Sequence, residues 1–253
     1  MTGQIVVSIK DLKDEPYASI ICYPKLTEDE LRGRVRQLEL HGVTALEFAG
    51  KGCLLNVPVL GKGNVGIVVA AYRYGQKLAL KIRRIDADRE DLLHEAKMLT
   101  AANVAGVGPI LVEASKNFLL MQLVEGDFLP EWLNATNDKT ILRQVLGELM
   151  EECWKLDLAG VDHGELSKAP KHVIIDVYGQ PWIVDFETSS GKRKAANVAA
   201  ICQYLLMSGG PVSKRAAEIL GDRDREKIVK ALRVYKKEKT RDSMDKLVHA
   251  CLY

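Results

Sequence analysis

The hydrophobic pattern of this chain changes near residue 125, and this change constrains the fold more than any other feature of the sequence. Before it, three β-rich runs joined by glycines, CLLNVPVLG, GIVVAAYRYG and QKLALKIRRI, occupy residues 53–85. Such runs are typical of consecutive antiparallel strands. A helix is predicted over 87–106, where apolar residues share one helical face, and two more strands are predicted over 109–112 and 118–124. Residues 53–124 are therefore predicted to form a β-rich lobe with one helix.

In the rest of the chain apolar residues recur at helical spacing. A long helix is predicted over 140–158, and further helices over 197–207 and from 224 to the end. Between them, VIIDVYGQPWIVDF predicts a short hairpin. Because a β-rich part precedes a helical part, the predicted fold class is α+β in two lobes.

The first 52 residues read as a small unit of their own. IVVSI and VTALEF are predicted strands. Thr27 and Glu30 form a capping-box pattern in front of a helix, and Gly42 is predicted to end that helix. The predicted boundaries are 1–52 for a strand-helix-strand extension, 53–124 for the β-rich lobe, 125–210 for the helical lobe and 211–253 for a basic helical segment.

The composition excludes several classes of protein. Of the 253 residues, 47% are hydrophobic and 28% are charged, which excludes a disordered chain. No apolar run approaches the roughly 18 residues that span a bilayer, and the N-terminal segment has acidic residues and no apolar core, unlike a signal peptide. The five cysteines form no CxxC pair, so we expect buried thiols in a reducing compartment. These features predict a cytoplasmic protein with no membrane contact.

Basic residues are concentrated in the C-terminal segment. The net charge of the whole chain is +2, but from Pro211 onward there are 12 Lys and Arg against 7 Asp and Glu, a net charge of +5. Either this segment binds nucleic acid or an acidic partner, or it is a solvated helical segment. The interleaving of both signs favours the second interpretation.

A glycine-rich run, Gly61-Lys62-Gly63-Asn64-Val65-Gly66-Ile67-Val68, carries the first chemical signal. In such a turn, backbone N–H groups can approach phosphate oxygens without obstruction by side chains. The pattern GxGxxG also occurs in dinucleotide-binding loops, where it opens a helix. Here β-branched residues follow it, so the run is predicted to join two strands, either as a phosphate-binding loop or as an ordinary hairpin.

A lysine on the next predicted strand gives the second signal. Ala79 and Lys81 share one face of that strand. A buried lysine needs an anionic partner to keep its charge. Glu95 is the predicted partner because it lies beside the apolar face of the following helix, and Glu90 and Asp91 are the alternatives.

Two short segments, DHGEL at 162–166 and VDFE at 184–187, complete the pattern. The order GxGxxGxV, AxK, a helical Glu, HxE and DF resembles that of eukaryotic-like protein kinases. HGEL and LLMQLVEGDFL resemble the RIO-type and KEOPS-complex kinases more than typical protein kinases. Residues from Cys53 to about Met207 thus resemble an archaeal-type Ser/Thr protein kinase domain, which implies a bilobal kinase-like fold with ATP and Mg²⁺ as cofactors.

The resemblance implies a role for each matching residue. Lys81 would hold the α- and β-phosphates and pair with Glu95, Asp185 would bind Mg²⁺, and Glu165 stands where the family has its catalytic Asp. The adenine would pack on Ala79, in front of Met121, and meet the backbone of Gln122 and Val124. The residues implied to bind nucleotide are Gly61, Lys62, Gly63, Asn64, Gly66, Val68, Ala79, Lys81, Glu95, Met121, Gln122 and Val124.

The chain also departs from the family pattern. Glu165 replaces the catalytic Asp, and Pro170 stands where the family has an Asn that binds metal. Counted back from Asp185, the equivalent position falls near His172, so His172 or Glu187 would supply a second metal contact; a hydrogen-bonded structural histidine is the alternative for His172. No APE motif or long activation loop follows.

These features predict an ATP- and Mg²⁺-dependent phosphotransferase that acts on Ser or Thr of a protein substrate. One alternative is a small-molecule kinase of the aminoglycoside or choline kinase type. The others are a pseudokinase that binds nucleotide and scaffolds a complex, and a nucleic-acid-associated protein that uses its basic C-terminal segment.

Overall fold

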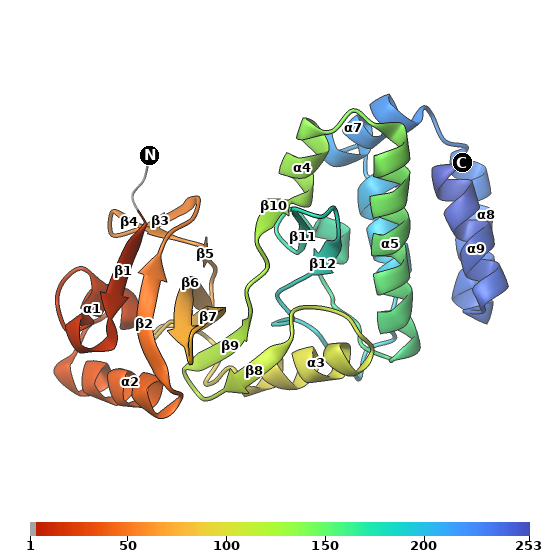
Figure 1. The fold of residues 1–253 in the computed structure, drawn as a ribbon. Helices are drawn as coiled ribbons and strands as arrows, with labels where there is room; N and C mark the ends of the chain where they lie inside the picture. The colour runs from red at the N-terminus through yellow and green to blue at the C-terminus, as the bar shows by residue number, and fades with distance from the viewer. Residues whose placement is uncertain (1–3) are drawn as a thin grey trace. The chain divides into compact units, whose positions relative to one another are not determined.

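The computed structural model describes residues 4–253 and confirms an α+β fold with a mostly antiparallel sheet and a helical part (Figure 1). By their contacts the residues divide into two units, rather than the four segments expected. The first unit comprises 1–97 and 110–123, and the second comprises 98–109 and 124–253. The division falls inside helix α3, Leu93–Val104, so this helix contributes to both units.

A seven-stranded antiparallel sheet forms the framework of the first unit. Its strands follow the order β1-β2-β6-β7-β9-β8, and β5 also pairs with β6. A separate hairpin of β3 and β4 precedes β5. The strands are β1 (Ile5–Ser8), β2 (Val43–Phe48), β3 (Gly52–Leu54), β4 (Val57–Val59), β5 (Gly61–Lys62), β6 (Gly66–Arg73), β7 (Gln76–Arg83), β8 (Leu111–Ala114) and β9 (Phe118–Gln122).

The N-terminal residues belong to this sheet and do not form a separate module. β2 pairs with β6, with Leu46 opposite Ala71, so β1 and β2 extend the sheet at that edge. Three helical segments accompany them: η1 (Ile9–Asp11), α1 (Tyr17–Ile21) and α2 (Glu28–Leu40). One hydrophobic core joins Leu38 of α2 to Leu46 and Leu80 of the sheet, because burying these apolar side chains together removes them from water.

The ends of α2 follow the sequence prediction. The Thr27 hydroxyl accepts a hydrogen bond from the Glu30 amide, which satisfies one of the free N–H groups of the first turn. Gly42 adopts a φ of +70° directly after the helix, a conformation that glycine takes without steric cost. The capping residue and the stop residue are both confirmed.

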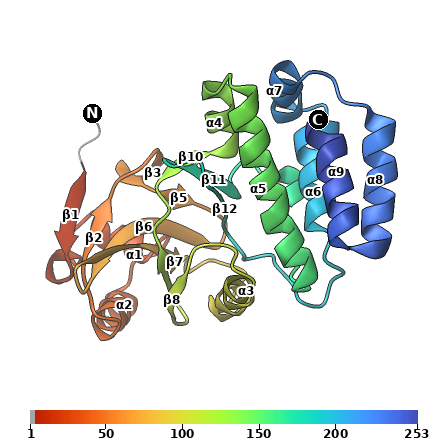
Figure 2. The ribbon, with the colours of Figure 1, turned by 45° about the vertical axis from the view of Figure 1, so that its right-hand side comes forward.

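Helices dominate the second unit, and α5, α6, α8 and α9 lie side by side in it (Figure 2). Short strands β10, β11 and β12 form a small antiparallel sheet. The elements are β10 (Gly126–Phe128), α4 (Leu129–Ala135), α5 (Lys139–Leu158), η2 (Leu166–Lys168), β11 (Val173–Asp176), β12 (Pro181–Ile183), α6 (Asn197–Cys202), the π-helical turn η3 (Gln203–Met207), α7 (Pro211–Leu220), α8 (Arg225–Glu238) and α9 (Arg241–Leu252).

The basic C-terminal segment packs into the second unit. The buried Tyr235 of α8 donates a 2.7 Å hydrogen bond to the Asp157 carboxylate at the end of α5. Lys239, with a φ of +50°, separates α8 from α9 where a single helical stretch was predicted. Over residues 4–253, none of the helices combines the length and the apolar character that a membrane crossing requires.

Candidate active site

The glycine-rich run forms a turn between two strands, as the sequence predicts. Gly61 of β5 pairs with Val68 of β6, and the Gly63 amide donates a 2.8 Å hydrogen bond to the Gly66 carbonyl. The run therefore closes a hairpin and does not open a helix. This geometry argues against a dinucleotide-binding loop, which requires a helix after the glycines.

Gly66 makes room for the side chain of Lys81. A Cβ atom at Gly66 would lie 2.9 Å from Lys81 Cγ and 3.0 Å from Lys81 Cε, closer than real Cβ contacts allow. At Gly63 the nearest atom to such a Cβ lies 3.7 Å away, which is an ordinary contact. Of these two glycines, only Gly66 is required by the packing of the lysine.

Lys81 and Glu95 form a buried ion pair. Lys81 Nζ lies 2.7 Å from Glu95 Oε2, and the two side chains are only 6% and 4% exposed. The predicted partner is therefore confirmed against Glu90 and Asp91. Desolvation of two charges costs free energy that their attraction offsets only in good geometry, so a pair of this kind contributes little net stability.

Two of the residues implied to contact adenine, Ala79 and Met121, lie on the same face of the sheet as Lys81. Lys81 is paired with Val68 of β6, and Ala79 is paired with Met121 of β9. Residues that lie opposite one another share a face, and so do residues two apart on a strand. Val68, Ala79, Lys81 and Met121 thus line one surface of the first unit.

Tyr23 and Arg84 support the glycine turn, and neither was predicted from the sequence. The Arg84 guanidinium donates a 3.1 Å hydrogen bond to the Gly63 carbonyl and lies 5.1 Å from the centre of the Tyr23 ring. Lys62 Nζ lies 5.0 Å from the same centre. These cation–π contacts hold the turn from one side. No sequence motif indicates these contacts, because Tyr23 precedes the turn by about forty residues.

Three other residues implied to contact nucleotide lie outside this surface. Asn64 is exposed at the tip of the turn. The Gln122 amide donates to the Ile110 carbonyl, and the Gln122 side chain accepts from the Ile110 amide. Val124 is the first residue after the division and belongs to the second unit.

In the second unit, Asn197 holds the DHGEL segment in place. Its side-chain oxygen accepts a 2.9 Å hydrogen bond from the His163 amide, and its side-chain nitrogen donates to the Val161 carbonyl at 2.7 Å. The Asp157 carboxylate in turn accepts from the Asn197 side chain and amide. This network is buried, so each of its members is costly to remove. No sequence pattern pointed to Asn197 beyond its place at the start of a predicted helix.

His163, the second residue of the same segment, is fully buried. Its Nε2 lies 3.0 Å from the Val184 carbonyl, and its ring meets the edge of Phe186 at 5.2 Å between centres. Burial lowers the pKa of His163 below its usual value, although the hydrogen bond to Val184 acts in the opposite direction. His163 is therefore a neutral structural residue that joins the DHGEL segment to the VDFE segment.

The side chain of Glu165 is 43% exposed and lies next to His172. Its Oε2 is 3.4 Å from His172 Nε2, while His172 Nδ1 is buried without a hydrogen-bond partner in the described chain. The imidazole therefore lies beside the carboxylate and restricts the space around it. The Glu165 carboxylate is accessible to solvent.

Asp185 adopts a left-handed backbone conformation, with a φ of +66°. Such strain in a residue other than glycine is typical of functional sites. The neighbouring Phe186 is 1% exposed and fixes the position of the segment, since its ring packs where a Cβ at Gly108 would lie. The buried ring therefore anchors the backbone directly after Asp185.

Asp185 and Glu187 suit a hard divalent cation. Their carboxylate oxygens lie within 4.8 Å of each other, and both side chains are partly buried. Oxygen ligands of this kind are those that Mg²⁺ prefers. The sequence offered Glu187 and His172 as the second metal ligand. The Glu187 carboxylate lies within 4.8 Å of that of Asp185, whereas His172 lies beside Glu165.

The predicted residues therefore assemble into two sets, one on each unit. Gly66, Lys81 and Glu95 are brought together on the first unit, and Glu165, His172, Asp185 and Glu187 lie in neighbouring segments of the second. The chain matches no protein-family model, and its sequence matches no curated protein.

Proposed function

We propose that this chain is an ATP- and Mg²⁺-dependent phosphotransferase, an atypical protein kinase acting on Ser or Thr. The buried Lys81–Glu95 ion pair carries the proposal. It contributes little to stability, yet a glycine at position 66 is needed to accommodate the lysine stem. We therefore assign the lysine a chemical role, because an oriented ammonium on an apolar surface suits the phosphates of a nucleotide.

The remaining residues have roles in the same reaction. Asp185 and Glu187 would hold Mg²⁺, which would neutralise charge on the phosphates when bound. Glu165, which lies beside His172, would accept the proton of the substrate hydroxyl. Phosphoryl transfer depends mainly on positioning and electrostatics, so a Glu in place of Asp is compatible with activity.

The placement of Glu165 also favours a second candidate, a protein that binds nucleotide without transferring phosphate. The His172 ring occupies one side of the Glu165 carboxylate, which a substrate hydroxyl would otherwise approach. A kinase for small alcohols is the third candidate. Incubation with radiolabelled ATP and either protein or small-alcohol acceptors separates the three.

Substitution of Glu165 tests the proposal. Glu165→Gln keeps the shape but cannot accept a proton, so transfer should fall by about 10²–10⁴-fold while ATP affinity stays unchanged. Glu165→Asp withdraws the carboxylate from His172 by one methylene and should also be slower than the parent. Full transfer activity in Glu165→Gln would contradict the assigned base, and absence of transfer in the parent would favour the binding protein.

A further inference from the structure

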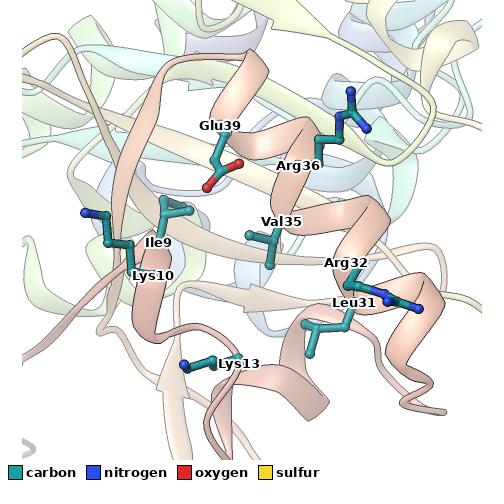
Figure 3. A pocket seen from close by; sticks show the side chains of 8 residues that line it. All are labelled: Ile9, Lys10, Lys13, Leu31, Arg32, Val35, Arg36 and Glu39. Atoms are coloured by element: carbon teal, nitrogen blue, oxygen red, sulfur yellow. The ribbon is translucent and has the colours of Figure 1, made fainter.

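A groove on the N-terminal part of the first unit contains none of the residues assigned to nucleotide. It lies between η1 with the residues after it and helix α2, and its volume is about 490 Å³ (Figure 3). The groove lies within residues 1–52, for which the sequence predicted a strand-helix-strand extension and no site. Its lining combines an apolar floor with a cationic rim.

The floor consists of the aliphatic side chains Ile9, Leu31 and Val35. Leu31 and Val35 are one helical turn apart on the same side of α2 as Leu38, and they are partly buried because they pack against the hydrophobic core that contains Leu38. Both side chains therefore pack on the core and still leave part of their surface in the groove. A partly exposed aliphatic floor of this kind favours an apolar ligand group.

The rim carries four cations and one anion. Lys10 and Lys13 come from one wall, and Arg32 and Arg36 come from α2 (Figure 3). In the described part of the chain, Lys10, Lys13 and Arg36 form no ion pair, and Arg32 pairs only with Asp29 of its own helix. Glu39 is the single carboxylate in the lining, so the groove has an excess of positive charge.

We propose that this groove is a docking site for an acidic peptide segment of a protein partner, with an aliphatic side chain packed on the exposed parts of Leu31 and Val35. Charge complementarity with the rim selects acidic residues, and the floor accepts a Leu or Ile. Single-stranded nucleic acid fits less well, because such sites stack bases on aromatic rings and none lines this groove. The site would add partner recognition to the chain independently of its phosphotransferase activity.

Fluorescence anisotropy with the full chain tests the proposal. The probe is a fluorescein-labelled peptide, EELLDDLLEE, and the comparison peptide replaces each Leu by Ser. We expect saturable binding of the first peptide that weakens with added salt, and much weaker binding of the second. Lys10→Glu combined with Lys13→Glu should weaken binding by about tenfold or more, because two attractions become repulsions.

A matched control is Lys25→Glu with Lys116→Glu. This variant makes the same change of charge at two exposed lysines of the same unit that do not line the groove, and its affinity should stay within about twofold of the parent's. Equal weakening by both double variants would overturn the proposal, since only net charge would matter. Equal affinity for the Leu and Ser peptides, or tighter binding of an oligouridylate of equal charge, would also overturn it.

Discussion

Replacing Gly66 by alanine tests the link between the glycine turn and the buried lysine. The new Cβ would lie 2.9 Å from Lys81 Cγ, 3.0 Å from Lys81 Cε and 3.1 Å from the Ile82 carbonyl oxygen. The lysine stem cannot rotate away without breaking the 2.7 Å contact with Glu95. We expect the free energy of unfolding to fall by about 1–3 kcal/mol, the usual range for overpacking a buried site.

Gly63→Ala is the matched control, because its Cβ would meet nothing closer than 3.7 Å. Its unfolding free energy should stay within about 0.5 kcal/mol of the parent's or rise slightly, since alanine restricts the unfolded chain. Urea denaturation measures both variants. Equal stabilities of Gly66→Ala and Gly63→Ala would refute the steric argument.

The same pair of variants separates stability from nucleotide binding. If the lysine of Gly66→Ala moves, its charged hydrogen bonds to phosphate are lost, which costs about 1.5–3 kcal/mol or roughly 10–100-fold in ATP affinity. Calorimetric titration should show this loss for Gly66→Ala and not for Gly63→Ala. A destabilised Gly66→Ala protein with the parent's ATP affinity would keep the packing argument and contradict the phosphate role of Lys81.

Further predictions concern the buried Lys81–Glu95 ion pair and the buried His163. Lys81→Met should destabilise the fold by about 3–5 kcal/mol because it removes the ammonium group that lies 2.7 Å from the buried Glu95 carboxylate. Adding Glu95→Leu should recover most of that loss, and additive losses in urea denaturation would argue against a buried pair. The lowered pKa of His163 means that below about pH 6.5 the unfolded chain binds a proton that the folded chain does not. The free energy of unfolding should therefore fall as the pH is lowered from about 7.5 to about 5.5, and less steeply in His163→Asn; identical slopes would show that His163 titrates normally.

Local signals in the sequence predicted much of the fold. The capping pair at Thr27 and the stop at Gly42 depend only on neighbouring backbone groups, so the helix between them was predictable. The prediction of a separate N-terminal extension was wrong, because β2 pairs with β6 in the same sheet. The paired residues are about twenty-five positions apart in the sequence, so no local pattern indicates the pairing. Short elements such as α1, β10 and α4 carry too few residues to show a period, and they were missed.

In the candidate site, too, only contacts between neighbouring elements could be predicted from the sequence. Lys81 and Glu95 could be matched because a buried cation requires an anion, and a strand and the following helix offered few choices. Asn197 could not be found, since its partners His163, Val161 and Asp157 come together only through tertiary folding. The contact of His172 with Glu165 likewise depends on how the loop between them folds, which the spacing of two residues does not determine.

Transfer of the γ-phosphate of ATP to protein, compared between the parent and Asp185→Asn, tests the central claim most directly. Asparagine tolerates the left-handed backbone that Asp185 adopts, so the variant keeps the fold while losing the charge that would hold Mg²⁺. Asp88→Asn, at an exposed position outside both sets of site residues, is the control. We predict Mg²⁺-dependent transfer by the parent and by Asp88→Asn, and a loss on the order of 10²–10³-fold in Asp185→Asn. Equal transfer by all three proteins, or transfer that does not need a divalent cation, would contradict the account.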